Sequence, residues 1–173
     1  MNEIKPFPTL DIALHLDASD VLAAGKLCLE FANTYNWHAS EHPVESLYSY
    51  SQLVDWAASV GIRSEESANE LKAHAANHPA LAEQIYEWAI ELREAIYRIF
   101  VAIAAQNEVK PTDLALLNEA LPHAFTLPEV EFSGSGFGVR WRGDESGLDG
   151  ILWPIVRSAV RLLTDGEHSR IGQ

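Results

Sequence analysis

The sequence is short of cysteine, of basic residues and of long apolar runs, and each shortage excludes a class of protein. Cys28 is the single cysteine among 173 residues. The chain therefore cannot form an internal disulfide or a multi-cysteine zinc site, and we expect a reducing, cytoplasmic compartment. No uncharged stretch approaches the roughly 20 apolar residues that a membrane span requires. No basic segment followed by an apolar one opens the sequence, so we expect no signal peptide.

Basic residues are outnumbered by acidic ones. The chain has 12 Lys+Arg and 25 Asp+Glu, a formal net charge of −13, which disfavours nucleic-acid binding by the chain as a whole. The stretch from Phe137 to the end is neutral, with five basic and five acidic residues, so the excess lies before it. If any part approaches a polyanion, we expect it to be the C-terminal end or a region beyond it.

Apolar periodicity predicts a mostly helical domain. Hydrophobic residues make up 47% of the chain, as in ordinary soluble proteins. Between Ala80 and Gln106 they recur at three- and four-residue steps, which predicts one long helix as the spine of the domain. Shorter helical patterns cover about 24–36, 51–60, 64–77, 112–121 and 151–164.

A change to period two after Val130 predicts a β-hairpin. The predicted fold class is therefore α+β: a mostly helical single domain with a long central helix and one β-hairpin before the last helix. Residues 1–20 are predicted to be an N-terminal lead-in, 21–165 the domain, and 166–173 the start of a linker.

Arg93 interrupts the apolar face of the predicted spine. At about 100° per residue it projects between Phe100 and Tyr86, away from the glutamates of the wet face. An unpaired buried charge is costly, so the guanidinium must reach water, stack on a tyrosine or meet a carboxylate. Two interpretations stay open: a structural ion pair across helices, or an anion-reading residue in a pocket.

The first predicted helix carries a polar strip formed by Glu30, Asn33 and Thr34. This strip could face water, or it could point into the body and supply Glu30 as the partner of Arg93, which is the pairing we predict. Cys28 lies on the apolar side of the same helix and is predicted to be a small core residue rather than a nucleophile.

Histidines and arginines elsewhere give no specific site. His38/His42 and His74/His78 have the i,i+4 spacing that binds zinc on a helix when a third ligand arrives, but neither pair has the glutamate neighbour of a metalloprotease motif. We expect no metal site there. Arg157 and Arg161 are expected to face solvent on the last helix. No nucleophile, paired-carboxylate or phosphate-loop pattern is present, so we predict no catalytic residue and no enzyme.

Three stretches resemble motifs of the ABATE domain, the N-terminal half of bacterial CGNR zinc-finger proteins, which are regarded as stress-induced transcription regulators. They are residues 27–34 (LCLEFANT), 92–98 (LREAIYR) and 152–159 (LWPIVRSA). Their order and spacing agree with the family across residues 20–170. The departures are Glu30 in place of the usual Asp and Val156 in place of the usual Ala.

The resemblance implies the sensor half of a cytoplasmic regulator. Such a domain is expected to bind an unknown small molecule while a C-terminal CGNR zinc finger, which this chain does not contain, holds zinc and binds DNA. We expect no cofactor or metal in this chain, no membrane partner, and a possible homo-oligomer. The candidate ligand-binding residues are Glu30, Asn33, Thr34, Arg93 and Trp153. The alternative is a protein–protein or dimerisation module with no small-molecule ligand.

Overall fold

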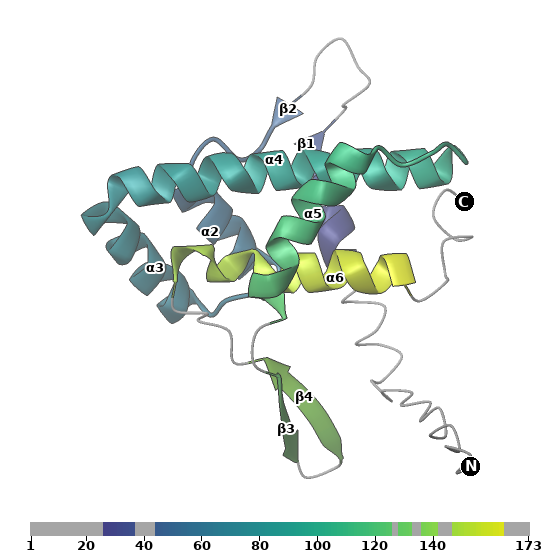
Figure 1. The fold of residues 1–173 in the computed structure, drawn as a ribbon. Helices are drawn as coiled ribbons and strands as arrows, with labels where there is room; N and C mark the ends of the chain where they lie inside the picture. The colour runs from purple at the N-terminus through teal and green to yellow at the C-terminus, as the bar shows by residue number, and fades with distance from the viewer. Residues whose placement is uncertain (1–25, 37–43, 126–127, 133–135, 142–146, 165–173) are drawn as a thin grey trace, which may run out of the picture.

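The computed structural model describes residues 26–36, 44–125, 128–132, 136–141 and 147–164, which form a helical body built around one long helix (Figure 1). In chain order, helical residues 26–32 are followed by β1 (Tyr35–Asn36), β2 (Val44–Glu45), α2 (Tyr50–Ser59), α3 (Glu65–Asn77), α4 (Pro79–Ala104), α5 (Pro111–Ala124), β3 (Pro128–Phe132), β4 (Phe137–Trp141), the 3-10 turn η1 (Leu148–Ile151) and α6 (Trp153–Thr164). The predicted lead-in (1–20) and linker (166–173) lie outside the described residues.

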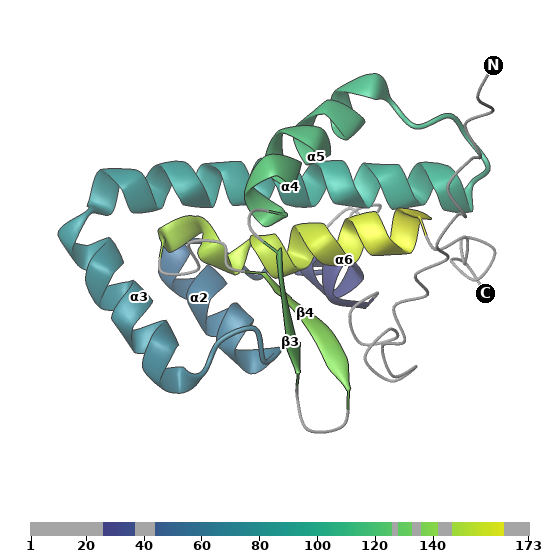
Figure 2. The same cartoon turned by 60° about the horizontal axis from the view of Figure 1, so that its bottom comes forward.

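The 26-residue helix α4 is the spine that the apolar periodicity predicts. Pro79 occupies its first turn, where a missing backbone N–H costs nothing. Its buried side chains recur at three- and four-residue steps, as Leu92, Ile96 and Ile99 do. Helices α2, α3 and α5 pack against it, and α6 runs beside it in both views (Figures 1 and 2). No helix of the described ranges is long and apolar enough to cross a membrane.

Local signals fix the ends of the shorter helices. The Ser49 side chain accepts a hydrogen bond from the Gln52 N–H at 3.4 Å and begins α2. Ser64 caps α3 in the same way, and two glutamates in the first turn complement the positive end of the helix dipole. Gly61, with φ of 81°, takes the left-handed conformation directly after α2. These stops and starts agree with the sequence pattern.

The predicted fold class, α+β with a β-hairpin as its β part, is wrong: this is a mainly helical fold. In the described residues the strands form only two separate two-stranded ribbons, β1–β2 and β3–β4, and the core residues come from the helices and their connections. On β3, Val130 is 74% exposed and Phe132 is 64% exposed, so these two apolar side chains lie outside the core. The period-two pattern indicates local chain geometry and says nothing about whether another layer covers the strand.

Cys28 ties the N-terminal helical residues to α6. Its side chain is completely buried, and its backbone N–H donates to Ser158 Oγ at 3.1 Å. Burial raises the pKa of the Cys28 thiol to about 11, although the Ser158 hydrogen bond acts in the opposite direction. The prediction of a core cysteine is confirmed, because a thiol in this environment stays protonated and inaccessible.

We expect Cys28 to resist thiol reagents in the folded protein and to react once the chain unfolds. At pH 8 a chromogenic disulfide reagent should report no rapidly reacting thiol in native protein and one per chain in denaturant. The rate in water should follow the rare opening of the segment around Cys28, since the buried thiol itself is out of reach. A fast stoichiometric reaction with native protein would contradict this placement.

Candidate functional site

Arg93 on α4 is buried against the β1–β2 ribbon, with 2% of its surface exposed. The prediction that it lies on the apolar side of the spine is confirmed. Its carboxylate partner is Glu45 of β2: Nη1 donates to Oε1 at 2.7 Å and Nη2 donates to Oε2 at 2.7 Å. Two parallel charge-assisted bonds of this kind match the planar fork of a guanidinium to both oxygens of a carboxylate.

The other N–H groups of Arg93 also face oxygens. Nη1 donates to Thr34 Oγ1 at 3.3 Å, Nε donates to Glu94 Oε1 at 3.2 Å, and Nη2 lies 3.1 Å from the same Glu94 oxygen. The Tyr35 ring centroid is 5.3 Å from the guanidinium carbon, within cation–π range. The guanidinium thus donates four hydrogen bonds and forms ion pairs with two carboxylates, which offsets the cost of desolvating the cation. Thr34, Tyr35, Glu45, Arg93 and Glu94 are called the Arg93 cluster below.

Glu45 is fixed by its own neighbours as well as by Arg93. Its Oε1 accepts the backbone N–H of Ser46 at 2.9 Å and that of Leu47 at 2.8 Å. The Ser46 N–H also points to the Thr34 carbonyl oxygen at 3.0 Å, and the Tyr86 hydroxyl donates to the Leu47 carbonyl at 2.9 Å. The Glu45 carboxylate therefore connects β2 with the backbone of Ser46 and Leu47 and with Arg93 on α4.

The predicted pair between Glu30 and Arg93 is wrong. The helical residues end at 32, so Glu30 and Asn33 are left exposed while Thr34 turns inward and is 7% exposed. The carboxylate comes instead from Glu45, a residue that the sequence analysis missed. Within the described residues Glu30 forms no ion pair with Arg93. Periodicity offers no signal for Glu45, because β2 is only two residues long.

Trp153 lies in a different part of the molecule from the Arg93 cluster. It is 3% exposed, stacks on His123 with ring centroids 5.3 Å apart and meets Trp88 edge-on at 5.7 Å. These neighbours belong to α5 and α4, whereas the partners of Arg93 outside α4 are Thr34, in the turn before β1, and residues of the β1–β2 ribbon. Of the five candidate residues, Thr34 and Arg93 come together. A ligand-binding role for all five stays a prediction.

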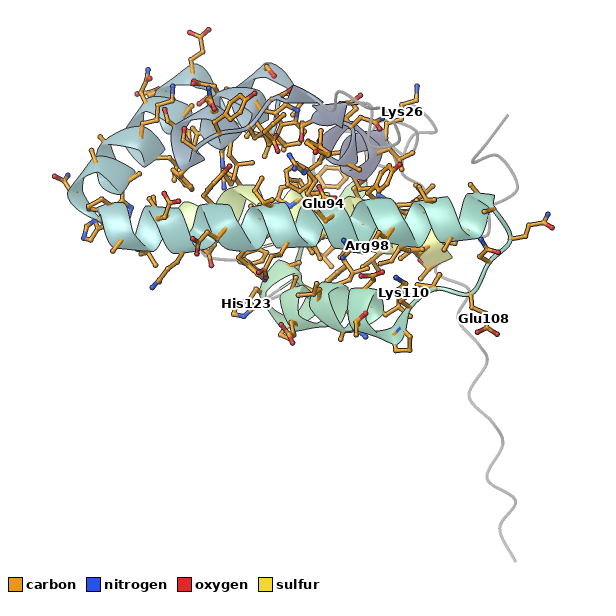
Figure 3. All side chains as sticks on the ribbon, turned by 90° about the horizontal axis from the view of Figure 1, so that it is seen from above. Lys26, Glu94, Arg98, Glu108, Lys110 and His123 are labelled. Atoms are coloured by element: carbon orange, nitrogen blue, oxygen red, sulfur yellow. The ribbon has the colours of Figure 1, made fainter. Side chains whose placement is uncertain are left out.

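Two further arginines hold α5 in place. Arg98 donates from Nε and Nη2 to Oδ1 of Asp113, at 2.9 and 2.7 Å, and Asp113 is 4% exposed. In Figure 3, Arg98 lies on the side of α4 that faces α5. Arg157 donates to the Ala124 carbonyl at 2.8 Å, so it caps the end of α5 rather than simply facing solvent as expected. Arg161 is half-buried.

The histidine pairs gain no support as metal ligands. The rings of His74 and His78 meet edge to face at 4.7 Å, and His78 Nδ1 lies 3.0 Å from the His74 carbonyl oxygen. Across the described ranges, no three His, Cys, Asp or Glu side chains gather as a metal site would need. His38 and His42 lie outside the described residues.

Comparison with known families finds a match that covers most of the chain. Residues 25–166 match the ABATE family, described as "Putative stress-induced transcription regulator". The match spans most of the chain and contains all three stretches that carry the sequence resemblance, so the chain belongs to the ABATE family. No curated protein and no solved structure matches it.

The Arg93–Glu45 pair is expected to give folding stability a distinct acid dependence. Partial burial raises the pKa of the Glu45 carboxyl, but the Arg93 hydrogen bonds and charge and the Leu47 and Ser46 N–H groups together lower it below its ordinary value. A carboxylate with a lowered folded-state pKa stabilises fully above its unfolded pKa, near 4.3–4.5, and the contribution is lost as the pH falls through the lower folded value.

Denaturant titrations between pH 3 and pH 7 would measure this dependence. Glu45→Gln should be less stable than wild type at pH 7, and the difference should shrink toward pH 3. Glu30→Gln is the matched control and should be as stable as wild type at pH 7, because Glu30 is exposed. Parallel profiles for Glu45→Gln and wild type would contradict the assignment.

Proposed function

We propose that this chain is the signal-receiving module of a stress-response transcription regulator and that it binds a small molecule at the Arg93 cluster. The observation that carries the proposal is a fully buried cation whose main partner lies on a weak element. Arg93 is fixed on a 26-residue helix, whereas Glu45 belongs to a ribbon with two residues in each strand. A two-stranded ribbon this short has little stability of its own, so its contact with Arg93 is a natural place for a ligand to act.

DNA recognition is proposed to belong to a C-terminal CGNR zinc finger rather than to residues 1–173. The chain has a net charge of −13, which opposes the phosphate contacts that supply most nonspecific DNA affinity. We also propose that the module has no catalytic activity of its own. Its role is to convert binding of an effector into a change that the zinc finger transmits.

A thermal-shift screen of small metabolites tests ligand binding directly. A ligand that binds only the folded chain raises its apparent stability by mass action. A hit should shift wild type and Arg98→Lys but not Arg93→Lys, because lysine cannot reproduce the bidentate fork. Arg98 is the matched control since it lies on the same helix and also pairs with a carboxylate. Hits that Arg93→Lys retains in full would refute the proposed site.

The chain alone is expected to bind duplex DNA weakly and without sequence preference. Fluorescence anisotropy at 50 mM and 200 mM salt should show an association that salt abolishes, because acidic residues outnumber basic ones. A scrambled duplex of equal length is the control. Tight, sequence-specific binding by residues 1–173 would contradict the proposed division of labour.

A dimerisation module is the second candidate, and the β3–β4 ribbon favours it. The ribbon stands apart from the helical body in Figures 1 and 2, with Val130 and Phe132 strongly exposed on β3. Light scattering after size exclusion would show a dimer that Phe132→Ser weakens. The control Val101→Ser changes an apolar side chain on α4 that is 46% exposed and should have no effect. A monomer at all concentrations would exclude this candidate.

A further inference from the structure

The carboxylate of Glu45 fills a set of hydrogen-bond donors that would suit any small carboxylate. The donors are the two terminal nitrogens of Arg93 and the backbone N–H groups of Ser46 and Leu47. We infer that these donors form a carboxylate-binding site in which Glu45 is the internal occupant, and that a small carboxylate ligand binds by exchanging with it. This inference rests on the proposed function, since it names the ligand class for the Arg93 cluster.

The donor geometry selects a carboxylate. Each oxygen of Glu45 receives one guanidinium nitrogen at 2.7 Å, so the fork reads two oxygens separated as in a carboxylate. One of these oxygens also receives both backbone N–H groups, at 2.9 and 2.8 Å. Four converging donors around two oxygens exceed what a simple surface ion pair provides, and charge-assisted bonds of this length are the strong ones.

Glu45 is the partner that can move, and Arg93 is the one that cannot. The Arg93 side chain is 2% exposed, whereas that of Glu45 is 22% exposed and can be reached from solvent. Glu45 belongs to β2, which among the described residues pairs with β1 alone, at Tyr35 and Asn36. Departure of Glu45 would not leave the cation bare, because Glu94 remains 3.1 Å from Nη2.

Competition with a tethered carboxylate sets a further requirement on the ligand. An internal group has a high effective concentration, so a free carboxylate must gain other contacts to displace it. The Tyr35 ring lies against the guanidinium and is half-buried, which offers an apolar face next to the charge. The ligand class that fits is a small carboxylate with an apolar or aromatic group.

Vacating the site by mutation tests whether it takes an external carboxylate. In the full chain, Glu45→Ala should be stabilised by sodium acetate in a saturable way, and wild type much less at the same concentrations. At ten times the dissociation constant the folding equilibrium constant rises about elevenfold, a shift in Tm on the order of 3–5 °C. Acetamide and sodium chloride are the neutral and ionic-strength controls and should give no such shift.

A second variant, Glu45→Gln, keeps the inference testable if Glu45→Ala does not fold. Glu45→Gln keeps the side-chain volume and removes the charge, so it should respond to acetate in the same direction. The double variant Glu45→Ala/Arg93→Met removes the cation and should lose the response. Absence of any acetate-specific shift in both single variants would overturn the inference. A response to phosphate with none to acetate would overturn the assignment to carboxylates.

The outcomes separate this inference from the proposed function. In one outcome, acetate stabilises Glu45→Ala but no compound of an aromatic carboxylate panel stabilises wild type. This result would support the carboxylate-binding site and count against the proposal that wild type uses it to receive a signal. A neutral metabolite that stabilises wild type through Arg93, with no acetate response in the variants, would support the receptor and overturn the inference. Phenylacetate exceeding acetate in wild type would support both.

Discussion

Replacing Arg93 with alanine is expected to lower the free energy of unfolding by about 3 kcal/mol. The change removes both bonds to Glu45 and leaves that carboxylate next to the core without its cation. Breaking a buried pair typically costs about 3–5 kcal/mol, and we place Arg93 at the lower end because Glu45, 22% exposed, keeps part of its hydration. Equilibrium urea unfolding at pH 7, with the slope compared between variants, measures the loss.

Three further variants test whether the loss comes from the Arg93–Glu45 pair. Arg93→Lys should recover only part of the stability, since an ammonium group cannot form the fork. Glu45→Ala should also be destabilising, whereas Glu30→Ala should change the free energy of unfolding by less than about 0.5 kcal/mol because Glu30 is exposed. A cost below about 1 kcal/mol for Arg93→Ala, the size of a surface ion pair, would mean that the cluster does not hold the ribbon on α4.

Trp153→Ala is expected to lower the free energy of unfolding by about 3–5 kcal/mol, the range for truncating a large aromatic side chain in a core. Trp153 begins α6, is 3% exposed, and contacts Trp88 of α4 and His123 of α5. Its removal leaves a cavity where three helices meet. Thermal and denaturant unfolding measure the cost, and near-ultraviolet circular dichroism reports the loss of the packed aromatic pair.

An exposed tyrosine provides a matched control for Trp153. Tyr48→Ala also removes an aromatic ring, but that side chain is 66% exposed, so the cost should stay below about 0.5 kcal/mol. Trp153→Phe should lie between the two, because a smaller ring still fills part of the space. Similar losses for Trp153→Ala and Tyr48→Ala would contradict the central position of Trp153 in the helical body.

The sequence was informative wherever the signal is local. The spine α4 follows from apolar residues at helical spacing, and the start of α3 follows from Ser64, whose hydroxyl accepts a hydrogen bond within the first turn. Arg93 was recognisable as an exception for the same reason, since its angular position depends only on its own helix. Its need for an acceptor follows from the cost of an unpaired buried charge.

Only the tertiary structure decided which carboxylate pairs with Arg93 and whether the strands contribute to the core. Glu45 is 48 positions away from Arg93, and the chain brings the two together through packing that no short-range pattern encodes. Glu30, which was predicted to share a helical strip with Thr34, is exposed, whereas Thr34 lies beyond the helical residues, which end at 32, and is buried. The alternation after Val130 likewise specified a two-stranded ribbon but not a covering layer, so the α+β expectation gave way to a helical core. Periodicity determines which side chains share a face, whereas burial depends on what the rest of the chain places against that face.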